Sequence, residues 1–277
     1  MRVWILLLCP LFTACQPASS EQGEEAHSAA DTTVEAKPAE EQAPSSLERA
    51  KAMGFDSNYL MGKFNPADHP DFVVIDNKYA DRSGLRLRRE AYEAFKAMEA
   101  AAKAAGLELV IRSATRNFNY QKGIWERKWT GQRRLSSGKN AAEAYPGAEE
   151  RALAILKYSA MPGTSRHHWG TDIDLNAFNN AYFESGKGLA IYQWLSEHAI
   201  EYGFCQPYTA KGEARPNGYN EEKWHWSYLP IAQPLTTLAE AELTNEMISG
   251  FQGAEAASSI DVLNNYILGI NPLCISR

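Results

Sequence analysis

Two segments of the sequence, about fifty residues apart, carry imidazole and carboxylate side chains at spacings that suit a metal site. The first offers two histidines and then two aspartates, namely His167, His168, Asp172 and Asp174. The second offers Glu222 and, three residues later, His225. Two histidines and one aspartate can hold zinc with a fourth position open for water, and a nearby glutamate can take that water's proton. The pattern therefore predicts a metal-dependent hydrolase.

The first segment ends in a short predicted strand in which polar and apolar residues alternate. Asp172 and Asp174 then share one face of the strand. Two carboxylates on one face beside a histidine are unfavourable without a cation. On an extended backbone neighbouring side chains point in opposite directions, so only one of His167 and His168 can face the metal. We expect His168 to pack behind the site. The alternative is a pair of solvent-facing aspartates and a loop histidine, which the second segment disfavours.

The elements that must position these residues are helices and a few separated strands. Apolar spacing predicts helices over 87–105, 118–129, 148–158 and 189–202, and strands over 107–111, 172–175 and 224–228. Glu222 lies at a turn that enters the last strand, and 207–220 forms a long loop rich in Gly, Pro and Asn. This order lacks a βαβ rhythm and predicts an α+β fold. We expect a small antiparallel sheet that carries the site, flanking helices, and a helical C-terminal extension over 236–250 and 259–268.

The N-terminal residues predict export and lipid attachment. Residues 1–14 combine Arg2 with an apolar run too short to span a bilayer, and small residues precede Cys15 as in a bacterial lipobox. An ordinary cleaved signal is the alternative. Residues 15–46 are acidic and poor in large apolar side chains, as in a disordered tether. The expected order is a signal over 1–14, a tether over 15–46, a peptidase domain over 47–235 and the extension over 236–277.

Charge and cysteine content narrow the functional class. The chain has 277 residues and a net charge of −6, which argues against a general nucleic-acid binder. Once Cys9 and Cys15 are assigned to the signal and the lipid, Cys205 and Cys274 remain. In an exported chain these two can form a disulfide that pins the C-terminus, and two independent buried thiols are the alternative.

The combined pattern resembles a known family. Ser-x-His-x-x-Gly-x-x-x-Asp followed by Glu-x-x-His is similar to the motifs of the VanY-type D-alanyl-D-alanine carboxypeptidases, within the zinc peptidases that include lysostaphin and the hedgehog domain. Further matches are Ser113 to Arg116, Gln121, Pro162 to Ser165, and Tyr202 to Phe204. The resemblance covers about 88–228. Two residues depart from the family pattern: Asp172 replaces a small residue and Asn117 replaces a frequent serine.

The resemblance implies a role for each site residue. His167, Asp174 and His225 would bind zinc, and Glu222 would be the general base. Arg116 would bind substrate and stabilise the oxyanion. Arg116, Gln121 and Ser165 are the candidate donors to a free terminal carboxylate, and these residues do not by themselves decide which donor takes that role.

Together these features predict a monomeric, lipid-anchored periplasmic enzyme. Gln16 after Cys15 favours the outer membrane. The expected activity is zinc-dependent removal of a terminal D-alanine from peptidoglycan stem peptides. The alternatives are an endopeptidase that cuts peptidoglycan cross-links and a non-catalytic zinc-bearing module that binds the cell wall. An intact Glu222 disfavours the module, because a structural zinc site does not require a base.

Overall fold

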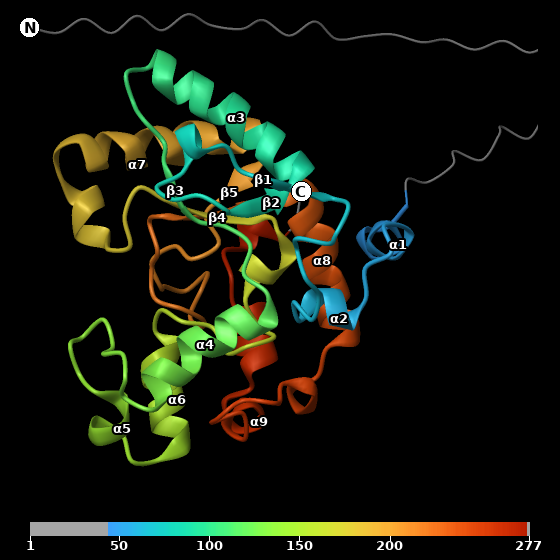
Figure 1. Cartoon of the computed structure of the whole chain (residues 1–277), viewed down its shortest axis with the longest axis vertical. Coiled ribbons are helices and arrows are strands. Elements are labelled where there is room, and N and C mark those ends of the chain that lie inside the picture. The colour runs from blue at the N-terminus through green and yellow to red at the C-terminus, as the bar shows by residue number, and fades with distance from the viewer. Residues whose placement is uncertain (1–43, 276–277) are drawn as a thin grey trace, which may run out of the picture. The chain divides into compact units, whose positions relative to one another are not determined.

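The computed structural model describes residues 44–275, and its strands form two antiparallel sheets (Figure 1). The larger sheet has the strand order β3-β4-β6-β5, with bounds β3 Ile111–Ser113, β4 Asp172–Leu175, β6 His225–Tyr228 and β5 Phe204–Cys205. The smaller sheet pairs β1, Phe72–Val74, with β2, Arg86–Arg88. Every strand pairing in both sheets is antiparallel.

The helices of the described part differ widely in length. They are α1 Ser46–Ala52, α2 Ser57–Leu60, α3 Arg89–Ala104, α4 Phe118–Trp129, α5 Ala141–Ala144, α6 Ala148–Leu156, α7 Gly186–His198, α8 Leu229–Glu242 and α9 Ala256–Ile260. A 3-10 turn over Arg166–Trp169 precedes β4. In α4 the side chain of Asn117 accepts a hydrogen bond from the backbone N–H of Tyr120. Serine makes the same N-cap, which explains why Asn117 is tolerated there.

The two faces of the larger sheet have different neighbours. Ile173, Leu175 and Trp226 belong to a buried apolar cluster that also includes residues of α3 and α7. Figure 1 shows α3 and α7 on one side of these strands and α4, α6 and α9 on the other. The alternation along β4 and β6 therefore directs Asp172, Asp174 and His225 away from the α3 and α7 layer.

The C-terminal part of the described chain is integrated with the rest. Helix α8 packs against α1 and α2, and residues 256–274 contribute to the same buried cluster as α4 and α6. Cys205 of β5 and Cys274 are joined by a disulfide. The link ties the last described turn, Pro272–Cys274, to the edge of the sheet.

The prediction of an α+β fold is confirmed, and several boundaries move. Helix 118–129 has the expected bounds, but the third helix ends at Leu156 and the fourth runs over 186–198. Strand pairing begins at Ile111 and continues to Ser113, so the strand expected over 107–111 is displaced toward the C-terminus. The helix expected over 236–250 begins at Leu229 and ends at Glu242, which places the expected boundary at 235 inside α8.

Two further points concern the predicted ends of the chain. The signal, Cys15 and most of the tether lie in residues 1–43, outside the described residues, whereas 46–52 of the described part form α1. Among the described residues, no helix combines the length and the apolar character needed to cross a membrane.

Candidate metal centre

The centre is built on two neighbouring strands, β4 and β6. Asp174 lies directly opposite His225 in the antiparallel register, and Asp172 lies opposite Ser227. Opposed residues of such a pair have Cβ atoms about 4.5–5.5 Å apart, so the backbone register alone brings the side chains together. His167 comes from the 3-10 turn that precedes β4 and not from an open loop.

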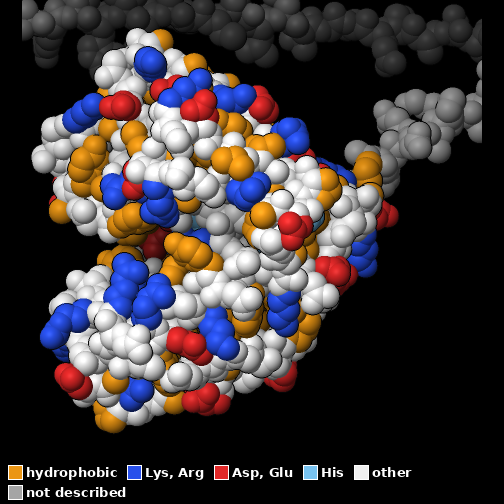
Figure 2. All heavy atoms as spheres, in the orientation of Figure 1, with side chains coloured by type: hydrophobic (Ala, Val, Ile, Leu, Met, Phe, Trp, Pro, Cys, Tyr) orange, Lys and Arg blue, Asp and Glu red, His pale blue; other side chains and the backbone are white. Residues whose placement is uncertain are grey.

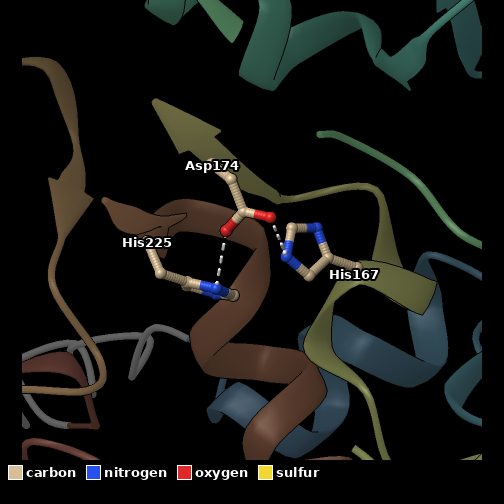
Figure 3. A group of neighbouring side chains, drawn as sticks. All are labelled: His167, Asp174 and His225. Atoms are coloured by element: carbon tan, nitrogen blue, oxygen red, sulfur yellow. Dashed lines mark ion pairs between the residues drawn. The ribbon is translucent and has the colours of Figure 1, made fainter. Parts of the chain in front are cut away.

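Asp174 lies between the two histidines (Figure 3). Its Oδ2 is 3.2 Å from Nε2 of His167, and its Oδ1 is 3.1 Å from Nδ1 of His225. One ligand atom from each of the three residues lies within 4.8 Å of the others. Two ligands of a tetrahedral zinc ion are about 3.4 Å apart when each bond is about 2.1 Å. The spacing of the three side chains fits such an ion.

Hydrogen bonds on the outer side of each imidazole orient the ring. Nδ1 of His167 donates to the carbonyl oxygen of Ala114 over 2.9 Å, and Nε2 of His225 donates to Oδ2 of Asp172 over 2.8 Å. Both acceptors lack a proton to give, so the opposite nitrogen of each ring is free to act as a ligand. Nε2 of His167 and Oδ1 of Asp174 are buried without a hydrogen-bond partner in the structure.

The charge around His225 also calls for a cation. Burial lowers the pKa of this imidazole, but Asp172, Asp174 and Glu222 raise it well above its usual value. For Asp174 the effects are reversed: burial alone would raise the pKa of this carboxyl group, but His167 and His225 hold it well below its usual range. The carboxylate is therefore ionised. A proton on His225 or a metal ion among the ligands can supply the positive charge that the site needs.

Asp172 is the fully buried centre of a polar network behind His225. Its two oxygens accept hydrogen bonds from Thr171, Ser227 and the Nε of Arg166, besides the bond from His225. Arg166 is also buried and donates to Ser227 and to Thr236 of α8. Burial raises the pKa of Asp172, but Arg166 and His225 lower it below its usual range. The aspartate that departs from the family pattern thus fixes the orientation of a ligand.

Glu222 precedes β6, as expected, and faces the centre. Its Oε2 is 3.4 Å from Nδ1 of His225, and its side chain is buried. Burial raises the pKa of Glu222, and the hydrogen bond to His225 opposes that rise. A carboxylate with a raised pKa is suited to accept a proton and to return it.

Arg116 is held beside the centre by Gln121, which the sequence had assigned to substrate, and by Ser113. Its Nε donates to Oε1 of Gln121 over 3.0 Å, and its Nη1 donates to Oγ of Ser113 over 2.6 Å. Nη1 also lies 3.5 Å from Oδ2 of Asp174. Gln121 is buried and donates its amide N–H to the carbonyl oxygen of Ala160, so its side chain helps to position Arg116.

His168 supports the backbone behind Arg116, in agreement with its expected packing role. Its Nε2 accepts a hydrogen bond from the N–H of Gly163, and its Nδ1 donates to the carbonyl oxygen of Arg116. Burial lowers the pKa of this imidazole to about 3. His168 is therefore neutral and lies apart from the metal ligands.

The centre lies in a cleft of about 840 Å³. All of the expected catalytic, metal-binding and substrate-binding residues border it, namely Arg116, Gln121, Ser165, His167, Asp174, Glu222 and His225. The space-filling view in Figure 2 shows a deep hollow on one face of the described part. A second hollow of about 310 Å³ shares Arg82, Ser113, Arg116 and Tyr120 with the cleft.

Comparison with known families identifies the chain. The family model described as "VanY: D-alanyl-D-alanine carboxypeptidase" matches residues 84–231, which include every residue of the centre. The chain belongs to this family. The matched residues contain the three-ligand group and Glu222 beside it, a set of side chains that suits zinc.

The sequence identity between this chain and individual VanY-family relatives is low. A D-alanyl-D-alanine carboxypeptidase of Enterococcus faecalis is 26% identical over 209 residues, which is 74% of this chain and 70% of that protein. The carboxypeptidase YodJ of Bacillus subtilis is 28% identical over 175 residues, which is 61% of this chain but only 56% of YodJ. Among solved structures, VanYB in complex with D-alanine-D-alanine has a TM-score of 0.46 and 24% identity over 66% of this chain and 90% of that chain.

Several residues of this VanY-family centre escaped the sequence-based reasoning. The ring of Tyr208 lies 4.7 Å from that of His225, and Tyr219 lies 4.9 Å from Tyr208, between ring centroids. Both tyrosines come from the predicted long loop and border the cleft. Arg215 is buried in this loop and donates to the carbonyl oxygens of Thr209 and Tyr219. Two tyrosines and an arginine in a long loop were the only signal in the sequence.

Proposed function

We propose that the chain is a zinc-dependent carboxypeptidase that removes the terminal D-alanine from peptidoglycan stem peptides. One observation carries the proposal: a buried His167, Asp174 and His225 group faces a buried glutamate and an anchored arginine in one cleft. The substrate follows from the VanY family and from the relatives that bear its name.

Zinc is the metal that this donor set fits. His167 would bind it through Nε2, His225 through Nδ1 and Asp174 through its carboxylate. When bound, zinc would supply Lewis acidity and lower the pKa of a bound water to about 7. Two neutral imidazoles and one carboxylate leave the ion with a net positive charge, which favours that acidity.

Glu222 and Arg116 perform the proton transfer and the charge stabilisation. Glu222 accepts the proton of the attacking water, which its raised pKa favours, and passes it to the nitrogen of the leaving amino acid. Nη2 of Arg116 has no hydrogen-bond partner within 44–275, while Nε and Nη1 are held in place. The guanidinium is therefore fixed in position to stabilise the negative charge on the peptide carbonyl oxygen or the terminal carboxylate.

The test is digestion of a synthetic stem pentapeptide by the metal-loaded protein, followed by mass spectrometry. We expect loss of one alanine, no loss with the L-isomer at the terminal position, and no loss after treatment with a chelator. A peptide with an amidated C-terminus should resist cleavage. Equal cleavage of the amidated and free-acid peptides would overturn the carboxypeptidase assignment.

Endopeptidase activity on cross-links is the second candidate, and the second hollow favours it. An endopeptidase must accommodate residues on both sides of the scissile bond, and the hollow of about 310 Å³ continues the cleft beyond Arg116. Incubation with purified cross-linked muropeptide dimers distinguishes the two activities. Release of monomers would establish the endopeptidase, and release of alanine alone would support the carboxypeptidase.

We also propose that Cys15 carries a lipid that anchors the enzyme in the periplasm, at the outer membrane. The lipobox-like residues before Cys15 and the acidic stretch after it support this proposal. Cys15→Ser should release the protein from the membrane fraction, and labelled fatty acid should no longer be incorporated. An unchanged membrane fraction in this variant would overturn the lipid anchor.

A further inference from the structure

One wall of the cleft carries a group of cations that the proposed chemistry does not use. The group, here called the basic wall, consists of Lys128, Arg133, Arg134 and Lys157. Lys128 belongs to the last turn of α4, the two arginines to the loop that follows, and Lys157 directly follows α6. Figure 2 shows Lys and Arg side chains gathered along one lip of the hollow.

In the described part of the chain, the basic wall has no acidic partner of its own. Of the described residues that border the cleft, only Asp174 and Glu222 are acidic, and both belong to the metal centre. Within 44–275, none of the four cations forms an ion pair, although Lys122 on the same helix pairs with Glu126. Lys128 donates to Oγ of Ser159, and Arg134 donates to the carbonyl oxygen of Gly138.

Lys128 is in an environment that disfavours its charge. Its side chain is half-buried, and burial followed by the charge of Arg133 lowers its pKa to about 8. Placing a partly desolvated ammonium group beside a guanidinium costs electrostatic free energy, and an anion bound between the two cations offsets that cost. The arrangement is that of a binding site for a negatively charged group.

We propose that the basic wall binds a second carboxylate of the substrate, on a residue upstream of the scissile bond. The inference rests on the proposed function and specifies its substrate as an acidic peptide. The terminal carboxylate cannot be this ligand, because the terminal residue must lie at Arg116 and the metal ligands to be released. A side-chain or α-carboxylate of an earlier residue can reach the wall.

The position of Lys128 supports an upstream subsite. Lys128 donates to Ser159, and the carbonyl of the next residue, Ala160, accepts from Gln121. Gln121 in turn accepts from Arg116, so the basic wall begins next to the residues that hold Arg116. A carboxypeptidase leaves a single residue beyond the scissile bond, and the rest of the peptide must occupy the cleft. The volume of about 840 Å³ has room for several residues beside the reacting one. Extended residues advance about 3.5 Å each, so several residues upstream of the scissile bond extend along the cleft that the basic wall borders.

Two positions of a stem peptide can supply the carboxylate, and four pentapeptides separate them. The second residue is γ-linked D-glutamate with a free α-carboxylate or its amide, and the third is diaminopimelate or lysine. Cleavage rates of the zinc-loaded protein give kcat/KM for each combination. We expect one of the two carboxylates to raise kcat/KM by about 10- to 100-fold, as charge-assisted hydrogen bonds typically do.

Charge-removing variants test whether the basic wall causes this preference. Lys128→Met combined with Arg133→Ala should reduce the ratio between the acidic and the neutral peptide to below about threefold. Arg127→Gln is the matched control, because Arg127 is the exposed neighbour of Lys128 on α4 and does not border the cleft. The control should keep the wild-type ratio.

Binding to a Glu222→Gln protein keeps the inference separate from the proposed activity. Titration of this variant with the four peptides gives dissociation constants without turnover. The basic wall is supported if the Glu222→Gln protein prefers an acidic peptide and the added substitutions Lys128→Met and Arg133→Ala abolish that preference. This result would support the wall even if the wild type cleaves no peptide. Equal affinities for all four peptides, or a preference that survives the two substitutions, would overturn the inference.

Discussion

Nε2 of His225 donates a 2.8 Å hydrogen bond to Oδ2 of Asp172, on the side of the ring that faces away from Asp174. The same carboxylate is bound by Arg166 and Ser227. A ligand histidine whose outer nitrogen donates to a carboxylate is fixed in both tautomer and orientation. Asp172 therefore determines which nitrogen of His225 is presented to a metal.

Asp172→Asn should weaken zinc binding by about 10- to 100-fold, because the amide orients His225 less firmly and leaves Arg166 without its counter-charge. Competition with a chelator of known affinity measures the change. Thr237→Ala, on the neighbouring position of α8 and outside the Asp172 network, is the control and should bind zinc as the wild type does. Wild-type affinity in Asp172→Asn would show that Asp172 has no influence on the ligand.

Glu222→Ala should retain zinc and lower kcat by about 10²- to 10⁴-fold, since the change removes the base and leaves the three ligands intact. Metal analysis and single-turnover cleavage of the same preparation check both parts. Loss of zinc from this variant would make Glu222 a ligand. His167→Ala and His225→Ala, by contrast, should lose the metal as well as activity.

Arg116→Lys should lower kcat/KM by on the order of 10²-fold, because a single ammonium nitrogen cannot reproduce the planar fork that binds Gln121 and Ser113 and directs Nη2 to the substrate. Gln121→Leu should show a smaller loss in the same direction, since it frees the guanidinium without removing it. The comparison needs kcat and KM for each variant. A Gln121 variant that is worse than the Arg116 variant would mean that Gln121 contacts the substrate itself.

The preference for acidic peptides should fall as the pH rises through about 8. The pKa of Lys128 is lowered to about 8, so its charge is present below that pH and is lost above it. The charges of Arg133, Glu222 and Arg116 all act on Lys128. The ratio of kcat/KM for acidic and neutral peptides, measured from pH 6 to about 9.5, checks this. The Lys128→Met variant should show a flat ratio.

The disulfide should contribute substantially to stability. Cys205 and Cys274 are separated by 69 residues, and closing a loop of that length stabilises the fold by about 4 kcal/mol in the chain-entropy model. The double Ser variant should therefore melt roughly 10 °C lower than the oxidised wild type. Thermal denaturation with and without reductant provides the measurement. Reductant should lower the melting temperature of the wild type and leave the variant unchanged.

The metal centre was predictable because its residue types and spacings are dictated by chemistry. Burial of His167, Asp174 and His225 is favourable only when the three side chains lie close together and share a cation. The structure brings them together. The role of Asp172 was not predictable, since its partners Arg166 and Ser227, and Thr236 that Arg166 also binds, come from three different elements. Only the folded arrangement shows that they share one network.

Strand bounds and the role of Gln121 illustrate a second limit. Residues 107–110 alternate as a strand does, but β4 has only four residues and its register pairs Leu175 with Ile111. Pairing of β3 therefore begins at Ile111, where β4 provides a partner strand, and not at Leu107, where the apolar alternation begins. Gln121 matched a family position, yet the sequence could not reveal that Arg116 and Ala160 take up its side chain.

The polypeptide itself holds the side chains of His167, Asp174 and His225 in place. Backbone pairing of β4 with β6 sets Asp174 against His225, and hydrogen bonds to Ala114 and Asp172 hold the two rings from behind. None of these contacts involves the ion, so we expect the three side chains to keep their positions during metal exchange and cobalt(II) to replace zinc without refolding of the chain. The visible absorption of cobalt would then report each step of substrate entry in a protein whose native ion is spectroscopically silent.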